Sequence, residues 1–341
     1  MQSSTIGIDI SKSIFQLHGV DRNGRKTFQQ KVSREHFIHT LSDIPPALIG
    51  MEACASSHYW SRRITELGHQ VKLINPAFVT PYVKSQKNDA HDAEAICEAV
   101  SRPSMRFVPC KSIEQQDIQA LHRVRTRLVK QRTALVNQIR GLLGEYGLIA
   151  PRGIHKIRKL LPELIVDGRL SVRSRMLFTE LRDEFLTLDG RIDDKDRELR
   201  DLAQSHSDCK RLMTIPGIGP LTATAIVMSV GRGTEFKNGR HMAAFIGLVP
   251  RQHSTGGRNR LGHITKRGDR YLRTLLVHGA RSLAMQTYRR PNAPNTWLKN
   301  LIDRRGFNLA CVAMANKMAR QAWCVLTSGA EYQHHAHKAS Q

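Results

Sequence analysis

Residues 5–32, TIGIDISKSIFQLHGVDRNGRKTFQQKV, decide the fold that this sequence predicts. The first six residues form an apolar run between polar neighbours, which predicts a buried strand. Residues 14–20 and 26–32 flank the pair Asn23-Gly24, and Asn-Gly between two strand-like segments is typical of a β-hairpin. Asp9 lies inside the first strand, where a carboxylate is costly to bury unless another group pairs with it. The stretch therefore predicts three antiparallel strands, the first of which carries an acid.

The residues that follow predict alternating helices and strands. Ser33 can cap a helix that runs to about Leu41, and an apolar strand then ends on Glu52. The sequence next predicts a helix, a strand that Asn75-Pro76 stops, and an Ala-rich helix that begins near Asp89 (residues 58–67, 71–74 and 89–100). Three antiparallel strands followed by such an alternation is the order of a ribonuclease-H-like fold.

Four acids fall at related places in these elements. Asp9 lies in the first strand, Glu52 closes a later strand, and Asp89 and Asp92 share one face of the first turn of a helix. For one helical pair, a purely structural role is available, because the helix dipole favours acids in the first turn. Four carboxylates that converge in one pocket would repel one another unless divalent cations neutralised them. Oxygen ligands suit Mg²⁺, so we expect these four acids to bind Mg²⁺ and to be catalytic.

Two long amphipathic segments come next. Apolar residues recur at heptad-like spacing in both (118, 121, 128, 135, 139 and 142 in the first; 177, 181, 185, 188, 192, 199 and 202 in the second). Residues 121–160 hold ten Lys or Arg and one acid, whereas residues 176–203 hold nine acids and five bases. Opposite charges and matching seams predict an antiparallel coiled-coil hairpin or a dimer element. The alternative is an amphipathic pair that packs on its own domain. Residues 151–174 would be the turn between the arms and a nucleic-acid contact.

The C-terminal third predicts a mainly helical domain. Ile215-Pro216-Gly217-Ile218-Gly219 enters a helix of small residues, as in a helix-hairpin-helix, whose turn presents backbone amides to a phosphate. The alternative is a helix–helix turn that only packs, and the sequence leaves both open. Helices at 271–285 and 309–326 complete the domain.

Residues 248–273, LVPRQHSTGGRNRLGHITKRGDRYLR, are the strongest candidate for a phosphate site outside the acids. Seven Lys or Arg stand there against one acid, Asp269, and two hydroxyls precede a glycine pair. Glycines let a backbone approach a ligand closely, and amides with cations around a hydroxyl suit a phosphate. A solvated basic loop that only touches a nucleic-acid backbone is the alternative. We expect nucleic-acid contacts from Thr255, Gly256, Gly257, Arg258, Arg260, Lys266 and Arg267, and also from Gly217 and Gly219.

Composition favours a polyanionic partner. The chain of 341 residues has a net charge of +24, and phosphate contacts release counterions from nucleic acid. Long apolar runs are missing, and the N-terminus lacks the layout of a signal peptide, so we expect a cytoplasmic protein without a membrane. Six scattered cysteines without metal-ligand spacing are expected to be small core residues.

The motifs of this chain resemble those of a known family. The chain resembles the DEDD-type, Piv-like transposases of insertion-sequence family 110, most closely the 1111 subgroup, nearly from end to end. The resemblance rests on GIDIS around Asp9, MEAC around Glu52, KNDAHDAEAI around Asp89 and Asp92, IPGIGPLTA, and AAFIGLVPRQHSTGGRNRLGHITKRGDRYLR. It implies a RuvC-like DEDD nuclease domain (1–110), a coiled-coil linker (111–208), a transposase domain with a catalytic serine loop (209–330) and a flexible tail (331–341).

The same resemblance implies the chemistry and the partners. Asp9, Glu52, Asp89 and Asp92 would bind the metal, and a serine would join covalently to donor and target DNA. Family members also use a noncoding guide RNA and act as homo-oligomers, dimers or tetramers, in the nucleoid of a bacterial cell. The family often places its serine directly before a glycine, where this chain has Thr255. A primary hydroxyl attacks phosphorus with less hindrance, so we expect Ser254 to be the nucleophile, with Thr255 as the alternative.

Three functions therefore compete. The first is an RNA-guided DNA recombinase that cuts and rejoins strands with Mg²⁺ and a serine nucleophile. The second is a RuvC-like, Mg²⁺-dependent nuclease that resolves junctions with water as the nucleophile. The third is a non-catalytic nucleic-acid scaffold, and the presence of all four acids counts against it.

Overall fold

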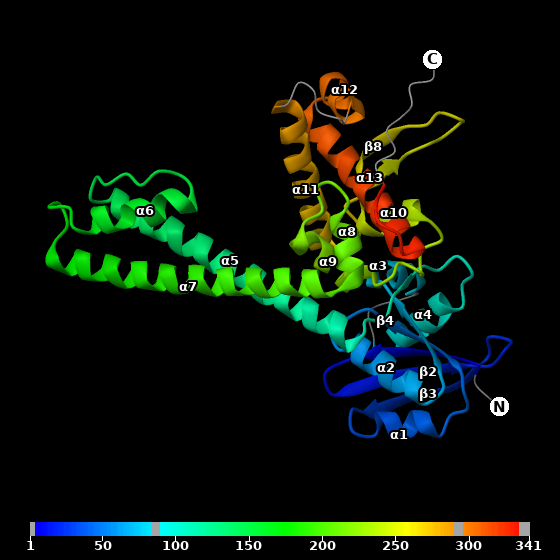
Figure 1. The fold of residues 1–341 in the computed structure, drawn as a ribbon. Coiled ribbons are helices and arrows are strands. Elements are labelled where there is room, and N and C mark those ends of the chain that lie inside the picture. Colours follow the sequence, from blue (N-terminus) through cyan, green and yellow to red (C-terminus); the bar gives the residue numbers. More distant parts are fainter. Residues whose placement is uncertain (1–3, 84–88, 290–295, 334–341) are drawn as a thin grey trace, which may run out of the picture. The chain divides into compact units, whose positions relative to one another are not determined.

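The structure is a computed structural model that describes residues 4–83, 89–289 and 296–333 (Figure 1). It divides into two units, Met1–Ile113 and Glu114–Gln341. The first is a mixed α/β unit around a central sheet, and the second is built mainly of helices. The segments at 87–88 and 334–341, which belong to a predicted motif and to the predicted tail, lie outside the described residues.

The first unit is organised around a six-stranded sheet with the order β3-β2-β1-β4-β5-β6. β1 (Thr5–Ile10), β2 (Ile14–Val20) and β3 (Lys26–Ser33) form the predicted antiparallel meander. β4 (Leu48–Glu52) and β5 (Gln70–Ile74) continue the sheet in parallel with β1, and the short β6 (Phe107–Val108) pairs antiparallel with β5. The strands predicted from the sequence are confirmed, and β6 was missed because two residues carry no periodicity.

Helices cover both faces of this sheet. Phe37 and Leu41 of α1 (Phe37–Ser42) and Trp60 and Ile64 of α2 (Ser57–Glu66) share a core with β1, β2 and β4. On the opposite face, α4 (Asp89–Val100) packs with the short helices α3 (Pro76–Val79) and η1 (Thr80–Tyr82). The prediction that Ser33 caps α1 is wrong. Its hydroxyl bonds to the Nδ1 atom of His36, at 2.9 Å, and the helix begins only at Phe37.

A long helical hairpin begins the second unit. α5 (Ile113–Gly144) and α7 (Val172–Ser205) run side by side, and Arg125 pairs with Asp196 while Arg132 pairs with Asp189 (Figure 1). Because the number of the partner falls as that of the arginine rises, the helices are antiparallel. The opposite charges of the two segments therefore meet within one chain. Leu142 and Leu177 of the predicted seams are exposed, however.

Residues 151–174 connect the two arms, as predicted, but they include a helix that the prediction did not specify. This helix is α6 (Ile154–Ile165), whose Ile157, Leu161 and Ile165 are buried against the two long helices. Its apolar residues recur at three and four positions, which is the helical signal that the Arg and Gly content of the segment concealed.

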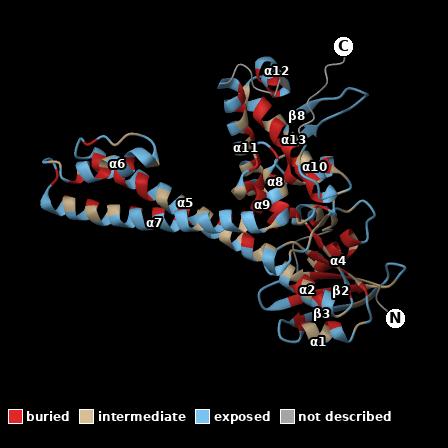
Figure 2. Ribbon diagram, viewed as in Figure 1, coloured by how far each residue is buried: buried red, intermediate tan, exposed pale blue. Residues whose placement is uncertain are grey.

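The remainder of the second unit is a helical bundle with a small hairpin of strands. It comprises α8 (Ser207–Met213), α9 (Pro220–Val230), α10 (Gly239–Ile246), α11 (Arg270–Arg289), α12 (Thr296–Arg305) and α13 (Phe307–Ser328). Residues Thr222–Val230 of α9 are buried without interruption, and α13 is buried along one side (Figure 2). Between α10 and α11 lie β7 (Pro250–Gln252) and β8 (Leu261–Ile264), an exposed antiparallel pair.

Two further expectations are answered by the structure. All six cysteines are unbridged, but only Cys97, Cys209 and Cys311 are buried, so the prediction of core positions is wrong for the other three. Although α5, α7 and α13 span 32, 34 and 22 residues, no helix in the described part of the chain is apolar enough to cross a membrane.

Candidate active site

Two acids end neighbouring strands of the sheet. β1 and β4 are parallel, with Gly7 opposite Gly50 and Ile8 opposite Met51. The next residue of each strand is an acid, so the register brings Asp9 beside Glu52. Side chains of in-register neighbours project from the same face of a sheet. Both acids are therefore carried on the face that also bears Gly7 and Gly50.

The two glycines let α4 approach that face closely. A Cβ atom on Gly7 would overlap the carbonyl oxygen of Ala93, and one on Gly50 would lie 2.8 Å from the Cβ of Val100. Gly7 and Gly50 thus contact the middle and the last turn of α4, where any other residue would separate helix from sheet. This approach brings the N-terminal turn of α4 to the end of β1.

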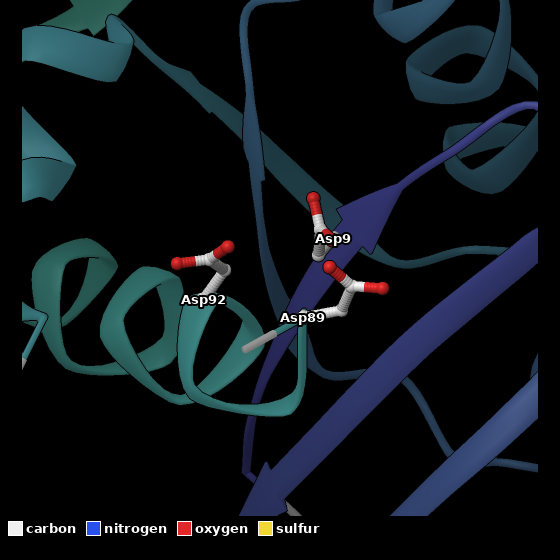
Figure 3. Close-up of side chains that lie close together, drawn as sticks. All are labelled: Asp9, Asp89 and Asp92. Atoms are coloured by element: carbon white, nitrogen blue, oxygen red, sulfur yellow. The ribbon is translucent and has the colours of Figure 1, made fainter. Parts of the chain in front are cut away.

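The approach of α4 assembles a cluster of three aspartates. Oxygen atoms of Asp9, Asp89 and Asp92 all lie within 4.8 Å of one another, and Figure 3 shows the three carboxyl groups converging from β1 and from the first turn of α4. Asp89 is exposed, while Asp9 and Asp92 are half-buried. Among the described residues, the exposure of Asp89 leaves the cluster accessible to a cation and a phosphate.

Glu52 lies outside this cluster of three but acts electrostatically at the same end of the sheet. Although Cys54 is exposed, partial desolvation of its thiol raises its pKa, and the charges of Glu52 and Asp9 raise that pKa further. The negative charges of both carboxylates therefore act on the same thiol. The structure thus brings together three of the four predicted acids and places the fourth on the neighbouring strand end.

The importance of Gly7, Gly50 and Cys54 was not anticipated from the sequence. The available signal was a repeated spacing, because a glycine precedes an acid by two residues in both Gly7-Ile8-Asp9 and Gly50-Met51-Glu52. In a strand, residues two apart lie on one face. A glycine two residues before each acid, on the same face of the sheet, therefore indicates that a helix packs closely on that face.

The second predicted site lies on the tip of the β7–β8 hairpin, where Ser254 belongs to a small polar network. The side-chain amide of Gln252 donates to the Ser254 Oγ atom at 2.8 Å, and the Ser254 hydroxyl donates to the Asn259 Oδ1 atom at 2.9 Å. Gln252 also donates to Asn259, at 3.2 Å. The network orients the hydroxyl, but an amide oxygen is not a base that could remove its proton.

Thr255 closes the tip of the hairpin through its backbone. Its N–H donates to the carbonyl oxygen of Arg258 at 3.4 Å, and the N–H of Arg258 donates back at 3.0 Å. Gly256 and Gly257 between them have φ angles of 54° and 74°, the left-handed region that glycine adopts without a steric penalty. The glycine pair is therefore explained by a tight turn, and it leaves Ser254 and Thr255 both exposed.

The base of the hairpin is fixed where Lys266 and Arg267 lie. A Cβ on Gly247 would overlap the carbonyl oxygen of Arg267, and one on Gly268 would overlap that of Phe245. The backbone N–H of Lys266 donates to the carbonyl oxygen of Gly247 at 3.1 Å, and Lys266 has a φ angle of 55°. The two cations are thus carried on a constrained backbone beneath the exposed tip.

The Gly-rich turn before α9 is used for packing at one of its two glycines. Gly217 has a φ angle of 89°, and a Cβ there would lie 3.0 Å from the carbonyl oxygen of Gly279 in α11. At Gly219 the space is open. The structure therefore supplies a packing reason for Gly217 and none for Gly219.

Two family models match this sequence. The model described as transposase, IS116/IS110/IS902 family, matches residues 209–295, and the model DEDD_Tnp_IS110, described as transposase, matches residues 6–148. The second match spans the acid cluster, and the first spans the β7–β8 hairpin.

Relatives resemble the chain over almost its whole length. It is 49% identical over 330 residues to a probable family 20 transposase of Pseudomonas aeruginosa, a match that covers 96% of this chain and 98% of the relative. It is 46% identical over 333 residues to the transposase for insertion sequence element IS1111A of Coxiella burnetii, with 96% and 90% covered. A more distant relative is the pilin gene-inverting protein of Moraxella lacunata, 23% identical over 272 residues, or 75% of each chain.

Proposed function

This chain belongs to the IS110/IS116/IS902 family of insertion-sequence transposases, and we propose that it cuts DNA with a Mg²⁺-dependent acid site and captures the cut end on Ser254. The observation that carries the proposal is the convergence of Asp9, Asp89 and Asp92 within 4.8 Å. We also propose that the sheet unit is a ribonuclease-H-like, RuvC-like domain. Its order β3-β2-β1-β4-β5, with only β4 and β5 parallel to β1, supports that assignment.

The ligand set of the cluster fits Mg²⁺ better than it fits a softer metal. All three groups offer carboxylate oxygens, which Mg²⁺ binds at about 2.1 Å together with water molecules. Oxygens on one ion of that size are separated by roughly 3–4 Å, so small side-chain rotations would suffice. Glu52, on the neighbouring strand end, would complete the set. When bound, Mg²⁺ would supply positive charge to a scissile phosphate and favour deprotonation of the attacking group.

The roles of the chain's own residues follow from their contacts. Gln252 and Asn259 hold the Ser254 hydroxyl in one orientation, with an oxygen lone pair available for attack. Attack on phosphorus would form an Oγ–P bond and break the bond from phosphorus to the 3′ or 5′ oxygen of the strand. The hydroxyl proton would pass to water and the departing oxygen would take up a proton, so the end that keeps the phosphate would remain covalently attached. Arg258, Arg260, Lys266 and Arg267 would stabilise the additional negative charge on the phosphorus centre. Thr255 remains the alternative nucleophile.

Two partners are proposed from the family resemblance. One is a noncoding guide RNA that pairs with donor and target DNA, and the net charge of +24 is compatible with it. The other is a further copy of this chain, as a dimer or tetramer, in which the acids of one subunit act with the Ser254 of another. Sequencing the RNA that copurifies with the protein tests the first, and light scattering of the complex tests the second.

The cleavage proposal is tested by Asp9→Asn in a strand-cleavage assay with Mg²⁺. Loss of one carboxylate charge should abolish cleavage and leave nucleic-acid binding nearly intact. Full cleavage by Asp9→Asn would refute the assignment of the acids. Cleavage by the wild type without a protein–DNA adduct would favour the second candidate, a junction-resolving nuclease that uses water.

A further inference from the structure

The cationic side chains of helix α5 lie on two different faces of the helix. Arg125 and Arg132 face α7, where they pair with Asp196 and Asp189. Arg123, Arg127 and Lys130 are spaced by four and three residues, so they share another face, and all three are exposed. Within the described residues, none of these three makes an ion pair with a carboxylate. The ion pairs between α5 and α7 therefore account for the charges of Arg125 and Arg132, whereas they do not account for the charges of the other three residues.

The three unpaired cations line a cavity of about 460 Å³. Its other walls come from the same unit, from Met228 of α9 and from Tyr271 at the start of α11. The cavity therefore lies where the long hairpin meets the helical bundle. Arg127 also lines a second cavity, of about 530 Å³, which continues along α5 and α7 past Gln138 and Arg191, with Glu184 on its wall.

A hydrogen-bond network without net charge underlies the first cavity. The Thr224 hydroxyl donates to the carbonyl oxygen of Pro220 at 2.8 Å, so it accepts from the Nε2 atom of His122 at 3.0 Å. The Nδ1 atom of His122 then accepts the Tyr271 hydroxyl at 2.9 Å. Burial lowers the pKa of His122 to about 4, so the ring carries no charge near neutral pH. The network ties α5 to α9 and α11.

Asp269 is the one acid among the described residues that line this cavity, and its charge is already engaged. Its Oδ1 atom accepts the backbone N–H groups of Tyr271 at 2.8 Å and Leu272 at 3.1 Å, and its Oδ2 atom accepts the hydroxyl of Ser229 at 3.3 Å. A carboxylate in that position caps α11 and is stabilised by the helix dipole. The three cations therefore outweigh it.

We propose that this cavity binds the phosphodiester backbone of a nucleic-acid strand through Arg123, Arg127 and Lys130. Three cations on one helical face and a hydrogen-bond network without net charge favour an anion. The presence of a second cavity that shares Arg127 favours an elongated anion over an isolated phosphate. The site is separate in sequence from the β7–β8 hairpin, and it depends on the nucleic-acid substrate of the family but not on the identity of the nucleophile.

The proposal is tested by replacing Arg123, Arg127 and Lys130 together with glutamine in the full chain. The control replaces Arg200, Lys237 and Arg305, which are exposed cations of the same unit and remove the same charge. Fluorescence anisotropy would measure the binding of oligothymidylate, oligouridylate and duplex DNA of about 20 nucleotides or base pairs. The measurements would be made at several salt concentrations in EDTA, so that no strand is cut and a failure of the cleavage proposal cannot affect the result.

We expect the cavity variant to bind at least one probe about tenfold or more weakly. The slope of log affinity against log salt should fall by roughly two to three, because each lost phosphate contact removes about 0.7–0.9. The probe that is affected identifies the strand as DNA or RNA, single or double. Equal losses in the cavity and control variants would show diffuse attraction and would overturn the proposal.

A second measurement uses the wild type and does not depend on how the variants fold. Lysines would be acetylated with and without saturating oligonucleotide, for each of the three probes, and quantified by mass spectrometry. Lys130 should be protected severalfold, whereas Lys237, on the connection before α10, should be modified equally in both samples. Equal modification of Lys130 with and without every probe would refute the site.

Discussion

Gly7 of β1 lies directly against the carbonyl group of Ala93 in α4, with no room for a Cβ atom between them. This contact fixes how closely the helix approaches the sheet. Asp9 lies two residues after Gly7, and Asp89 and Asp92 lie within one turn before Ala93. The distance between acids on the strand and acids on the helix therefore depends on the absence of a side chain at Gly7.

Gly7→Ala should consequently disturb the acid cluster without changing any acid. The added methyl group must displace α4, and such overpacking costs about 1–3 kcal/mol of unfolding free energy. We expect Mg²⁺-dependent cleavage to fall at least tenfold, with weaker Mg²⁺ binding in calorimetry. The control is Gly24→Ala in the same unit, where the space is open and φ is 77°. It should lose about 1 kcal/mol of stability but keep its Mg²⁺ affinity. Unchanged cleavage in Gly7→Ala would contradict this role of the glycine.

The acids themselves could be predicted from the sequence because their chemistry is local. A carboxylate inside an apolar strand, such as Asp9, and a helix that begins with two acids are visible in the residue order. Their convergence depends instead on sheet order and on the close approach at Gly7 and Gly50, which are long-range contacts. Strands β1 to β5 were predicted within one residue at most ends, because buried strands with turn residues between them carry a strong local signal.

The failures have different causes. Residues 250–252 and 261–264 form strands although they are polar and mostly exposed, because the close contacts of Gly247 and Gly268 hold the two ends of the segment together. Asp269 was interpreted only as the single acid of a basic stretch. The helix predicted at 271–285 begins one residue after the observed start of α11, so the cap position of Asp269 was visible in the sequence and was not recognised.

The buried His122 should make stability depend on pH. Its folded pKa of about 4 lies below the ordinary value of 6.5, so the unfolded chain binds the proton more tightly. Stability should therefore be fully present above about pH 6.5 and be lost as pH falls toward 4, by at most about 3 kcal/mol from this group. Urea unfolding followed by circular dichroism should show a smaller loss over that range in His122→Gln. His278→Gln, an exposed control, should keep the wild-type profile, and parallel profiles for wild type and His122→Gln would contradict the assignment.

Substitutions at the two glycines of the turn before α9 can distinguish a packing role from a role in phosphate binding. Gly217→Ala should cost roughly 1–3 kcal/mol, because φ is 89° and the methyl group meets Gly279. Gly219 has a φ of −99° and open space, so Gly219→Ala should leave stability within about 0.5 kcal/mol of the wild type. Thermal unfolding measures both. If this turn contacts a phosphate at Gly219, that variant alone should bind DNA more weakly at unchanged stability. Equal stabilities of the two variants would contradict the packing assignment.

Binding should weaken steeply with salt, in part because of the hairpin tip. Arg258 and Arg260 are exposed, and replacing both with glutamine should lower the slope of log affinity against log salt by about two. Fluorescence anisotropy with duplex DNA provides the measurement, and Lys237→Gln with Arg200→Gln is a control of equal charge. An unchanged slope in the Arg258 and Arg260 variant would show that the tip does not contact the phosphate backbone.

The central claim is that the acid cluster and the Ser254 hydroxyl act in one reaction, and a covalent adduct tests it most directly. Wild type, Ser254→Ala, Thr255→Ser and Asp9→Asn would each be incubated with a suicide DNA substrate and Mg²⁺, and the linked peptide would be located by mass spectrometry. We predict an adduct on Ser254 in the wild type and in Thr255→Ser, and none in Ser254→Ala or Asp9→Asn. An adduct on Thr255, or one that forms in Asp9→Asn, would contradict the account.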